Sequence, residues 1–292
     1  MKSNEVFAKM QKEILGLMKT EGQDWTKSWI GVGVPTNFTS KKAYRGINQW
    51  WLAIQGYKSN EWGTFKQWKE KGYQVKKGSK STPIIFSSMQ KKKESWLKDE
   101  ELVRFKATGE LPSYFYWKSW NVFNADQVEG YTTNNEVKDP KRELTIEEVN
   151  AIQSFIDNTG ANIVIGGDVA CYKPSQDEIN MPHIKQFFSD SEYFAVTLHE
   201  LTHWTKHESR TNRDAKDLSY AEEELVAEIG SAFLSQLLGV EKSVRPCHAK
   251  YLNNWIEAIE DSEKAMIQAF SMAQKAVDFL TNTQEKKKEK AA

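Results

Sequence analysis

The five residues His-Glu-Leu-Thr-His at positions 199–203 constrain the fold of this chain more than any other feature of its sequence. The largely apolar segment before them predicts a helix that begins near Ser191 and continues through the motif. Two histidines four residues apart lie on one helix face, so both imidazoles can bind one ion. Glu200 lies beside the first histidine, where its carboxylate can take a proton from water that a metal activates. The motif therefore predicts a metal-dependent hydrolase site with His199 and His203 as ligands and Glu200 as the catalytic base.

A catalytic zinc site needs a third protein ligand. The stretch 220–238 is strongly apolar apart from several acidic residues, and it predicts a second helix. Glu224 and Glu228 lie one turn apart on the same side of that helix, so either could complete the site. We expect Glu224 to bind the metal and Glu228 to orient a ligand histidine, with the reverse assignment left open. Glu222 and Glu223 turn elsewhere on this helix and are expected to be exposed.

Zinc suits this donor set because imidazole and carboxylate ligands leave a fourth position open to water. Manganese is the alternative metal. Before the motif, the segments 171–172 and 179–182 predict a β-hairpin, and residues 161–165 predict a further strand. An edge strand beside such a helix can pair with an extended peptide, which favours a peptidase.

Basic and acidic residues are unevenly divided along the chain, although the formal net charge is zero. Residues 1–130 contain 22 Lys and Arg against 13 Asp and Glu, whereas residues 131–292 contain 18 against 27. Nine of the 11 Trp residues also lie in the first 130 positions. Residues 131–143 are polar and offer almost nothing to a core, as is typical of a linker. Two domains with different chemistry follow from this division.

The predicted fold class is α+β in two domains. A small α+β domain covers 1–130, a linker covers 131–143, a mainly helical domain with a short sheet covers 144–282, and a disordered tail covers 283–292. Expected elements of the first half are helices over 5–18 and 48–55, strands over 72–75 and 82–86 joined by a basic turn, an exposed tip over 91–104, and a strand over 114–117. In the second half Thr145 is expected to cap a helix, and a third long helix is expected from Ala249 to about Thr281.

Cations alternate with aromatic side chains at several places in the first half. Cations can track a phosphate backbone while exposed rings stack with bases, which suits single-stranded nucleic acid without strong sequence preference. The alternative is that the rings pack in a core, as clustered Trp and Tyr commonly do. The residues predicted to contact DNA are Lys41, Lys42, Tyr44, Arg45, Asn48, Trp50, Trp62, Lys66, Lys76, Lys77 and Lys80.

Other sequence features exclude several classes of protein. No run of about 18 apolar residues is present, so no membrane partner is expected. The first residues lack the features of a secretory signal, which predicts a cytoplasmic location. Cys171 and Cys247 are far apart and follow no metal-binding spacing, so we expect reduced thiols.

Several separate motifs, in the same order along the chain, resemble the ArdC-type antirestriction proteins of conjugative plasmids and the N-terminal region of plasmid TraC primases. The likeness rests on residues 37–48, 62–67, 75–78, 172–175, 179–182, 199–204 and 223–229. It implies a first domain that binds single-stranded DNA and a second, zincin-like metallopeptidase domain, which together protect incoming DNA from host restriction. Carried over by position, it implies His199 and His203 as ligands, Glu200 as acid and base, and Glu224 or Glu228 as third ligand.

The sequence thus predicts an antirestriction protein with single-stranded DNA and an unknown protein substrate as partners. Its peptidase site would be gluzincin-like, meaning an HExxH motif completed by a Glu. The alternative is a non-catalytic DNA-coating protein whose metal site is structural. Nucleic-acid hydrolysis is less suited to the site, because displacement at phosphate usually recruits two metal ions.

Overall fold

The computed structural model describes residues 3–22, 25, 33–133, 143–213, 218–240, 249–261 and 263–291. The helices are α1 (Ser3–Glu21), α2 (Ile47–Ala53), α3 (Phe65–Glu70), α4 (Asp99–Thr108), α5 (Ile146–Thr159), α6 (Asp190–Trp204), α7 (Tyr220–Leu238), α8 (Ala249–Asp261) and α9 (Glu263–Ala291). The strands are β1 (Thr36–Asn37), β2 (Glu61–Gly63), β3 (Gln74–Val75), β4 (Thr82–Lys91), β5 (Ser113–Asn124), β6 (Val128–Glu129), β7 (Asn162–Ile165), β8 (Cys171–Lys173) and β9 (Glu178–Met181). Within these ranges, no helix combines the length and the apolar character that crossing a bilayer requires.

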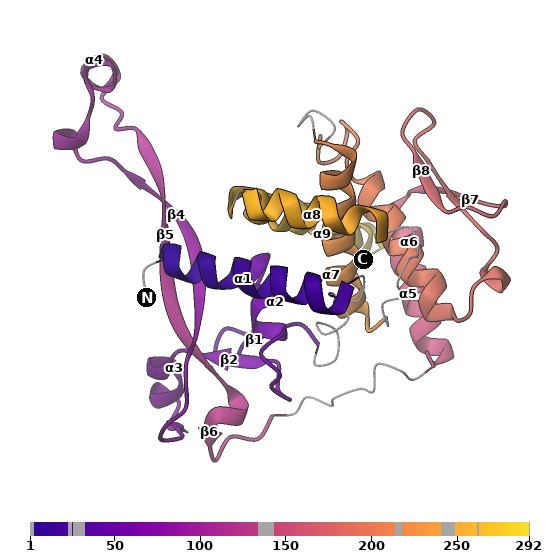
Figure 1. Cartoon of the computed structure of the whole chain (residues 1–292), viewed down its shortest axis with the longest axis horizontal. Helices are drawn as coiled ribbons and strands as arrows, with labels where there is room; N and C mark the ends of the chain where they lie inside the picture. The colour runs from indigo at the N-terminus through magenta and orange to yellow at the C-terminus, as the bar shows by residue number, and fades with distance from the viewer. Residues whose placement is uncertain are drawn as a thin grey trace.

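The first half is built on a long antiparallel ribbon of β4 and β5, which carries α4 at its far end (Figure 1). All ten residues of β4 pair with β5. The ribbon belongs to a four-stranded sheet with the order β1-β2-β5-β4. Helix α1 packs across it, and the rings of Phe7 and Trp117 meet edge to face with centroids 4.8 Å apart. The ribbon therefore has one part covered by α1 and a long part that extends beyond it.

One expectation for the first half needs correction. Strand β3 pairs with β6, and β4 pairs with β5, so the strands over 72–75 and 82–86 do not form a hairpin with each other. The expected exposed tip over 91–104 is confirmed at the end of the β4–β5 ribbon, and it contains helix α4, whose first turn holds three acidic residues that suit the helix dipole. The expected opening helix, the helix at 48–55 and the strands themselves are confirmed.

The second half contains a three-stranded sheet in the order β7-β9-β8. Strands β7 and β9 are parallel, and β8 is antiparallel to β9, which makes β8 an edge strand. The backbone N–H of Glu148 donates to the hydroxyl of Thr145 over 3.3 Å, and the Glu148 carboxylate accepts from the backbone N–H of Thr145 over 3.0 Å. This reciprocal cap fixes the start of α5, as predicted.

One continuous apolar core joins the two halves. It includes side chains from α1 and α2 together with side chains from α6, α7, α8 and α9. The rings of Trp50 and Phe270 lie 5.6 Å apart across this boundary. Among buried polar groups, the amide of Gln49 donates to that of Gln236 over 2.7 Å. The two halves are therefore packed on each other, and a separate smaller cluster around Phe38 and Trp68 fills the rest of the first half.

The end of the chain differs from the expectation. The region expected to form one helix from Ala249 to about Thr281 contains two helices, α8 and α9. Helix α9 continues to Ala291, so residues 283–291 are helical where a disordered tail was expected. The α+β class, with a mainly helical second half and a short sheet, is confirmed. The exact domain boundaries stay a prediction, because residues 134–142 lie outside the described ranges.

Candidate metal centre and nucleic-acid interface

Helices α6 and α7 hold the predicted metal site, and their start points are set by serine caps. The hydroxyl of Ser189 accepts from the backbone N–H of Glu192 over 3.1 Å, and Ser219 caps α7 in the same way. The two helices approach closely at Gly230, where an added Cβ would lie 2.5 Å from the Thr202 side chain. A glycine at this position lets the backbone of α7 lie directly against the motif helix.

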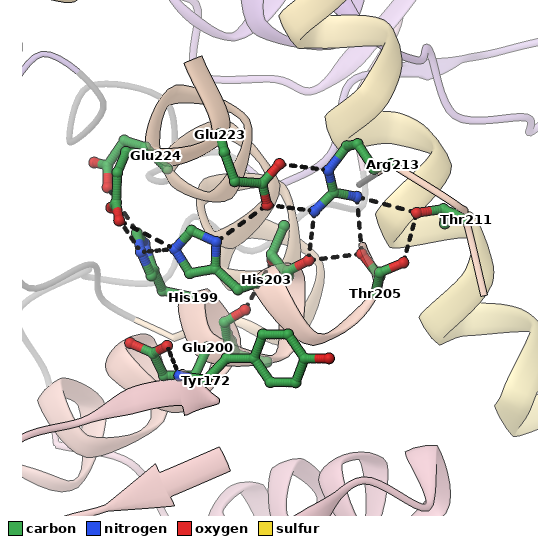
Figure 2. A network of polar contacts seen from close by, with 12 residues as sticks. Tyr172, His199, Glu200, His203, Thr205, Thr211, Arg213, Glu223 and Glu224 are labelled. Carbon is green, nitrogen blue, oxygen red and sulfur yellow. Dashed lines mark hydrogen bonds and ion pairs between the residues drawn. The ribbon is translucent and has the colours of Figure 1, made fainter. Parts of the chain in front are cut away.

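Three donor side chains converge between these helices (Figure 2). The Nε2 atoms of His199 and His203 lie 3.0 Å apart. The carboxylate of Glu224 places one oxygen 3.4 Å from the first and the other oxygen 3.5 Å from the second. Donors about 2.0–2.1 Å from one tetrahedral ion lie about 3.3 Å from each other, so this spacing fits a single zinc-sized cation. The structure thus brings together the three residues expected to be ligands.

Both histidines are backed by a carboxylate on their other ring nitrogen. The Nδ1 atom of His203 lies 3.1 Å from Glu223, and Nδ1 of His199 lies 3.8 Å from Glu228. The shorter contact, within hydrogen-bond distance, fixes the ring orientation and the tautomer of His203, whereas the longer one places a carboxylate beside His199. Glu228 lies beside a ligand histidine, and its orienting role stays a prediction. Glu223 corrects the expectation of an exposed side chain, because it is buried beside the site.

Arg213 anchors this arrangement and was not singled out in the sequence. Its guanidinium donates two hydrogen bonds to the Glu223 carboxylate, each 2.8 Å long. It also donates to the carbonyl of Thr202 over 2.8 Å and to the hydroxyl of Thr205 over 3.0 Å. Arg213 is buried, and a bidentate pair in a buried position is strong and directional. It ties the end of the motif helix to the carboxylate that supports His203.

Electrostatics in the site favour charged side chains. Burial lowers the pKa of His203, but hydrogen bonds to Glu223 and Glu224 outweigh it and raise this pKa to about 9. Burial raises the pKa of Glu223, but its bonds to Arg213 and His203 dominate and lower it to about 2. The pKa of Glu224 is also lowered, because the two histidines outweigh the effect of its burial. Both carboxylates are therefore ionised at neutral pH, as a cation site requires.

Glu200 lies against the edge strand β8. Its carboxylate accepts a hydrogen bond of 2.8 Å from the backbone N–H of Tyr172 (Figure 2). The hydroxyl of Tyr172 donates to Asp177 over 2.9 Å, and Arg210 binds the same carboxylate. The Arg210 guanidinium lies 4.0 Å from the ring centre of Trp204, at the end of α6. The hairpin of β8 and β9 is thus fastened to the motif helix, with the edge strand β8 bound to the predicted catalytic carboxylate.

The residues predicted to contact DNA divide into buried and exposed groups. Trp50 and Trp62 are almost fully buried, so a stacking role for these two rings is wrong. Asn48 is also buried, and its side chain binds both backbone groups of Ile85. Tyr44 is buried with its hydroxyl inside the protein, where burial raises its pKa. Sequence composition alone could not separate these core rings from accessible ones.

The predicted cations are all exposed: Lys41, Lys42, Arg45, Lys66, Lys76, Lys77 and Lys80. Lys41 is paired with Glu61 over 2.9 Å, and Lys76 donates to the carbonyl of Asp126 over 2.8 Å. Lys42, Arg45 and Lys66 line one common groove. Contact of these cations with DNA stays a prediction. Cys171 is a free, half-buried thiol, and Cys247 lies outside the described residues.

The fold and the three converging donors define a zincin-like protein. Residues 150–272 match the zincin-like metallopeptidase family, and residues 4–123 match the N-terminal domain of the anti-restriction factor ArdC. The antirestriction protein ArdC from the R388 plasmid, in a metal-free crystal structure, aligns with a TM-score of 0.78 and 33% identity, covering 95% of this chain and 97% of that one. Its Mn(II)-bound crystal structure aligns with a TM-score of 0.75, 32% identity and the same coverage.

The chain belongs to the ArdC antirestriction family. It is also 33% identical to the DNA primase TraC of Escherichia coli, in an alignment of 293 positions that covers 94% of this chain and 20% of that longer protein. It is 29% identical to the uncharacterized protein y4eC of Sinorhizobium fredii (strain NBRC 101917 / NGR234), with 94% of this chain and 91% of that protein covered. The chain therefore spans about a fifth of the primase and nearly all of the other relative.

Proposed function

We propose that this chain protects incoming plasmid or mobile-element DNA from restriction, binds single-stranded DNA through its first half, and carries a metal-dependent peptidase site in its second. The observation that carries the peptidase part is the convergence of His199, His203 and Glu224 beside Glu200 and the edge strand β8. Membership of the ArdC family and the basic first half support the DNA-binding part.

The donor set fits a divalent ion, with zinc expected and manganese the alternative. Such an ion supplies Lewis acidity to a carbonyl group and acidity to a water molecule. His199, His203 and Glu224 would hold it, Glu223 would keep the imidazole of His203 oriented, and Glu228 would approach His199 to do the same once the ion is bound. Glu200 then accepts the proton of the attacking water and delivers it to the leaving amine of the peptide.

A peptide in extended form suits the geometry beside this site. Strand β8 ends the sheet β7-β9-β8, and the backbone N–H of Tyr172 on this strand is held by the Glu200 carboxylate. A substrate strand added to this edge would take the N–H of Tyr172 from Glu200 and release the carboxylate to act on water. Proteolysis fits better than phosphodiester cleavage, because among the described residues one three-donor cluster is present and phosphate displacement usually uses two ions.

The test is cleavage by the metal-loaded full chain, with casein and a combinatorial peptide library as probes. Glu200→Gln keeps the size of the side chain and leaves the ligands intact, so metal content should be unchanged while cleavage falls by at least about 100-fold. Glu208→Gln, which changes an exposed carboxylate just beyond the motif helix, is the matched control and should cleave normally. Equal cleavage by the two variants would remove Glu200 from the mechanism.

The competing function is a DNA-coating protein whose metal site is structural. The shared core favours testing it in the whole chain, because removing the second half would expose the apolar faces of α1 and α2. If Glu200→Gln protects transferred DNA from restriction as well as the unaltered chain does, protection needs no peptidase. Loss of protection with unchanged metal content and DNA binding would instead assign the biological role to the peptidase site.

A further inference from the structure

A groove with a volume of about 1020 Å³ lies between the first half and helix α9. We call it the α9 groove. It is lined by residues 42–48 around the start of α2, by residues 84–87 of β4, by part of β5 and α3, and by the face of α9 from Ile267 to Asp278. Both halves of the chain therefore contribute walls to it, and the metal site is not among its lining residues.

Phe86 and Trp120 are the most exposed aromatic rings of the β4–β5 ribbon in the α9 groove, whose lining also includes Trp117. The exposed fraction is 45% for Phe86 and 52% for Trp120. Phe86 pairs with Lys118, and Ile84 pairs with Trp120, so the two rings are diagonal neighbours on one face of the ribbon. Large exposed rings beside each other are costly in water unless a ligand covers them. These rings have the placement that stacking against successive bases requires.

The groove also gathers positive charge from separate elements. Lys42 and Arg45 precede α2, Lys66 lies on α3, and Lys275 lies on α9. Lys66 is paired only loosely with Glu70, with 3.6 Å between the charged atoms and both side chains largely exposed. Exposed ion pairs of this kind contribute little to stability, so Lys66 can exchange Glu70 for a phosphate group. Cations around an aromatic face match a strand of nucleic acid, which presents phosphates outside unstacked bases.

Helix α9 contributes an acidic group that competes with phosphate. Asp278 forms an ion pair with Arg45 across the boundary between the two halves. Gln274, one turn earlier, donates to Asp278 over 3.1 Å and accepts from the backbone N–H of Gly46 over 2.7 Å. A guanidinium binds phosphate in the same bidentate manner as it binds carboxylate. The aspartate thus occupies the position on Arg45 that a phosphate group would take.

We propose that single-stranded DNA binds in the α9 groove, with bases stacking on Phe86 and Trp120 and phosphates contacting Lys42, Arg45, Lys66 and Lys275. The zincin-like half completes the DNA site through α9, and a phosphate displaces Asp278 from Arg45. This inference rests on the DNA-binding part of the proposed function. It replaces the buried Trp50 and Trp62 with two accessible rings that the sequence analysis did not select.

The experiment measures the anisotropy of a fluorescein-labelled oligothymidylate of about 20 nucleotides titrated with the full chain. Trp120→Ala and Phe86→Ala should each weaken binding by about tenfold. Trp96→Ala is the matched control, because Trp96 is 53% exposed at the far end of the same ribbon and outside the groove. It should bind like the unaltered chain. Thermal unfolding of each variant checks that the fold is intact.

Charge variants test the role of α9 separately. Lys275→Ala should weaken binding and reduce the slope of log affinity against log salt by roughly 0.7, as expected for one lost phosphate contact on a single strand. Lys185→Ala, an exposed lysine of the second half outside the groove, should change neither quantity. Asp278→Asn should tighten binding several-fold, because the competing carboxylate is removed.

The outcomes separate this inference from the proposed function. Normal binding by the folded Trp120→Ala, Phe86→Ala and Lys275→Ala variants, with strong binding by the unaltered chain, would place the DNA site elsewhere and leave the proposed function intact. Equal weakening by Trp96→Ala would also overturn the α9 groove as the site. If the unaltered chain binds no oligothymidylate, the DNA-binding part of the proposed function fails and this inference fails with it.

Discussion

Replacing Glu223 by Gln should weaken both metal binding and the fold, since this carboxylate connects His203 to the buried Arg213. The variant keeps the shape of the side chain but leaves the guanidinium without its counter-charge. The pKa of Glu223 is about 2, against an ordinary 4.5, and this difference corresponds to roughly 3 kcal/mol of stabilisation. Breaking a buried ion pair by removing one partner costs about 3–5 kcal/mol, which agrees in magnitude.

The effect on the metal should be smaller than the effect on stability. Removing the group that orients a ligand histidine typically lowers metal affinity by about 10–100-fold. Glu228→Gln is the informative comparison, because Glu228 is equally buried but lies 3.8 Å from the other ligand histidine and forms no ion pair with Arg213. Glu228→Gln should therefore reduce affinity with less loss of stability.

Two measurements check this prediction. Urea unfolding of the chelator-treated protein gives the loss of stability, and competition with a chromophoric zinc chelator gives the metal affinity. A double-mutant cycle with Arg213→Met isolates the coupling of the pair, which should exceed about 1 kcal/mol. The reasoning is refuted if Glu223→Gln unfolds at the same urea concentration as the unaltered chain and binds zinc with the same affinity.

Three further outcomes follow from the site. Gly230→Ala should lower the free energy of unfolding by about 1–3 kcal/mol and weaken metal binding, because the new methyl group would lie 2.5 Å from the side chain of Thr202 and push α7 away from α6. Urea unfolding and zinc competition measure the two effects. An unchanged urea midpoint would contradict the close approach of the helices. Chelation should lower the melting temperature of the metal-loaded chain, since an ion at about 100 times its Kd stabilises the fold by about 2.7 kcal/mol. Equal melting temperatures with and without the ion would show that the folded chain has no metal site. The pKa of His203 is about 9 in the folded protein, above its ordinary 6.5. The charged imidazole therefore stabilises the metal-free fold fully below pH 6.5, and this stabilisation is lost as the pH rises through 9. Urea midpoints of the chelated protein should fall across this pH window, and His203→Gln should flatten the change.

The ligands could be predicted from sequence because their geometry is local. Residues four apart on a helix share a face whatever the tertiary fold, so His199 and His203 need only a helix to converge. Glu224 required one more step, an acidic position on an apolar helix. Arg213 carries no such local signal, because its partner is ten residues away and the intervening segment decides whether they meet. Glu223 was misjudged for the same reason.

Stacking rings and strand partners could not be predicted for a related physical reason. A tryptophan has the same local sequence signal in a core and on a platform, and tertiary packing decides its exposure. Trp50 is buried by Phe270, which lies 220 positions later, whereas Trp120 stays exposed on the ribbon. Strand pairing is equally non-local, since β3 pairs with β6, which follows the whole β4–β5 ribbon in the sequence.

Helix α9 connects the metal site with the basic surface. Helix α9 packs on α7, which carries Glu224 and Glu228, and the same helix forms a wall of the groove beside Arg45. Its fully or nearly fully buried residues include Phe270, whose ring contacts the core of the first half. The metal site and the basic surface are thus held by one core, and neither half can be removed without exposing large apolar side chains to water. Point substitutions within the whole chain are therefore the perturbations that can separate DNA binding from metal chemistry in this fold.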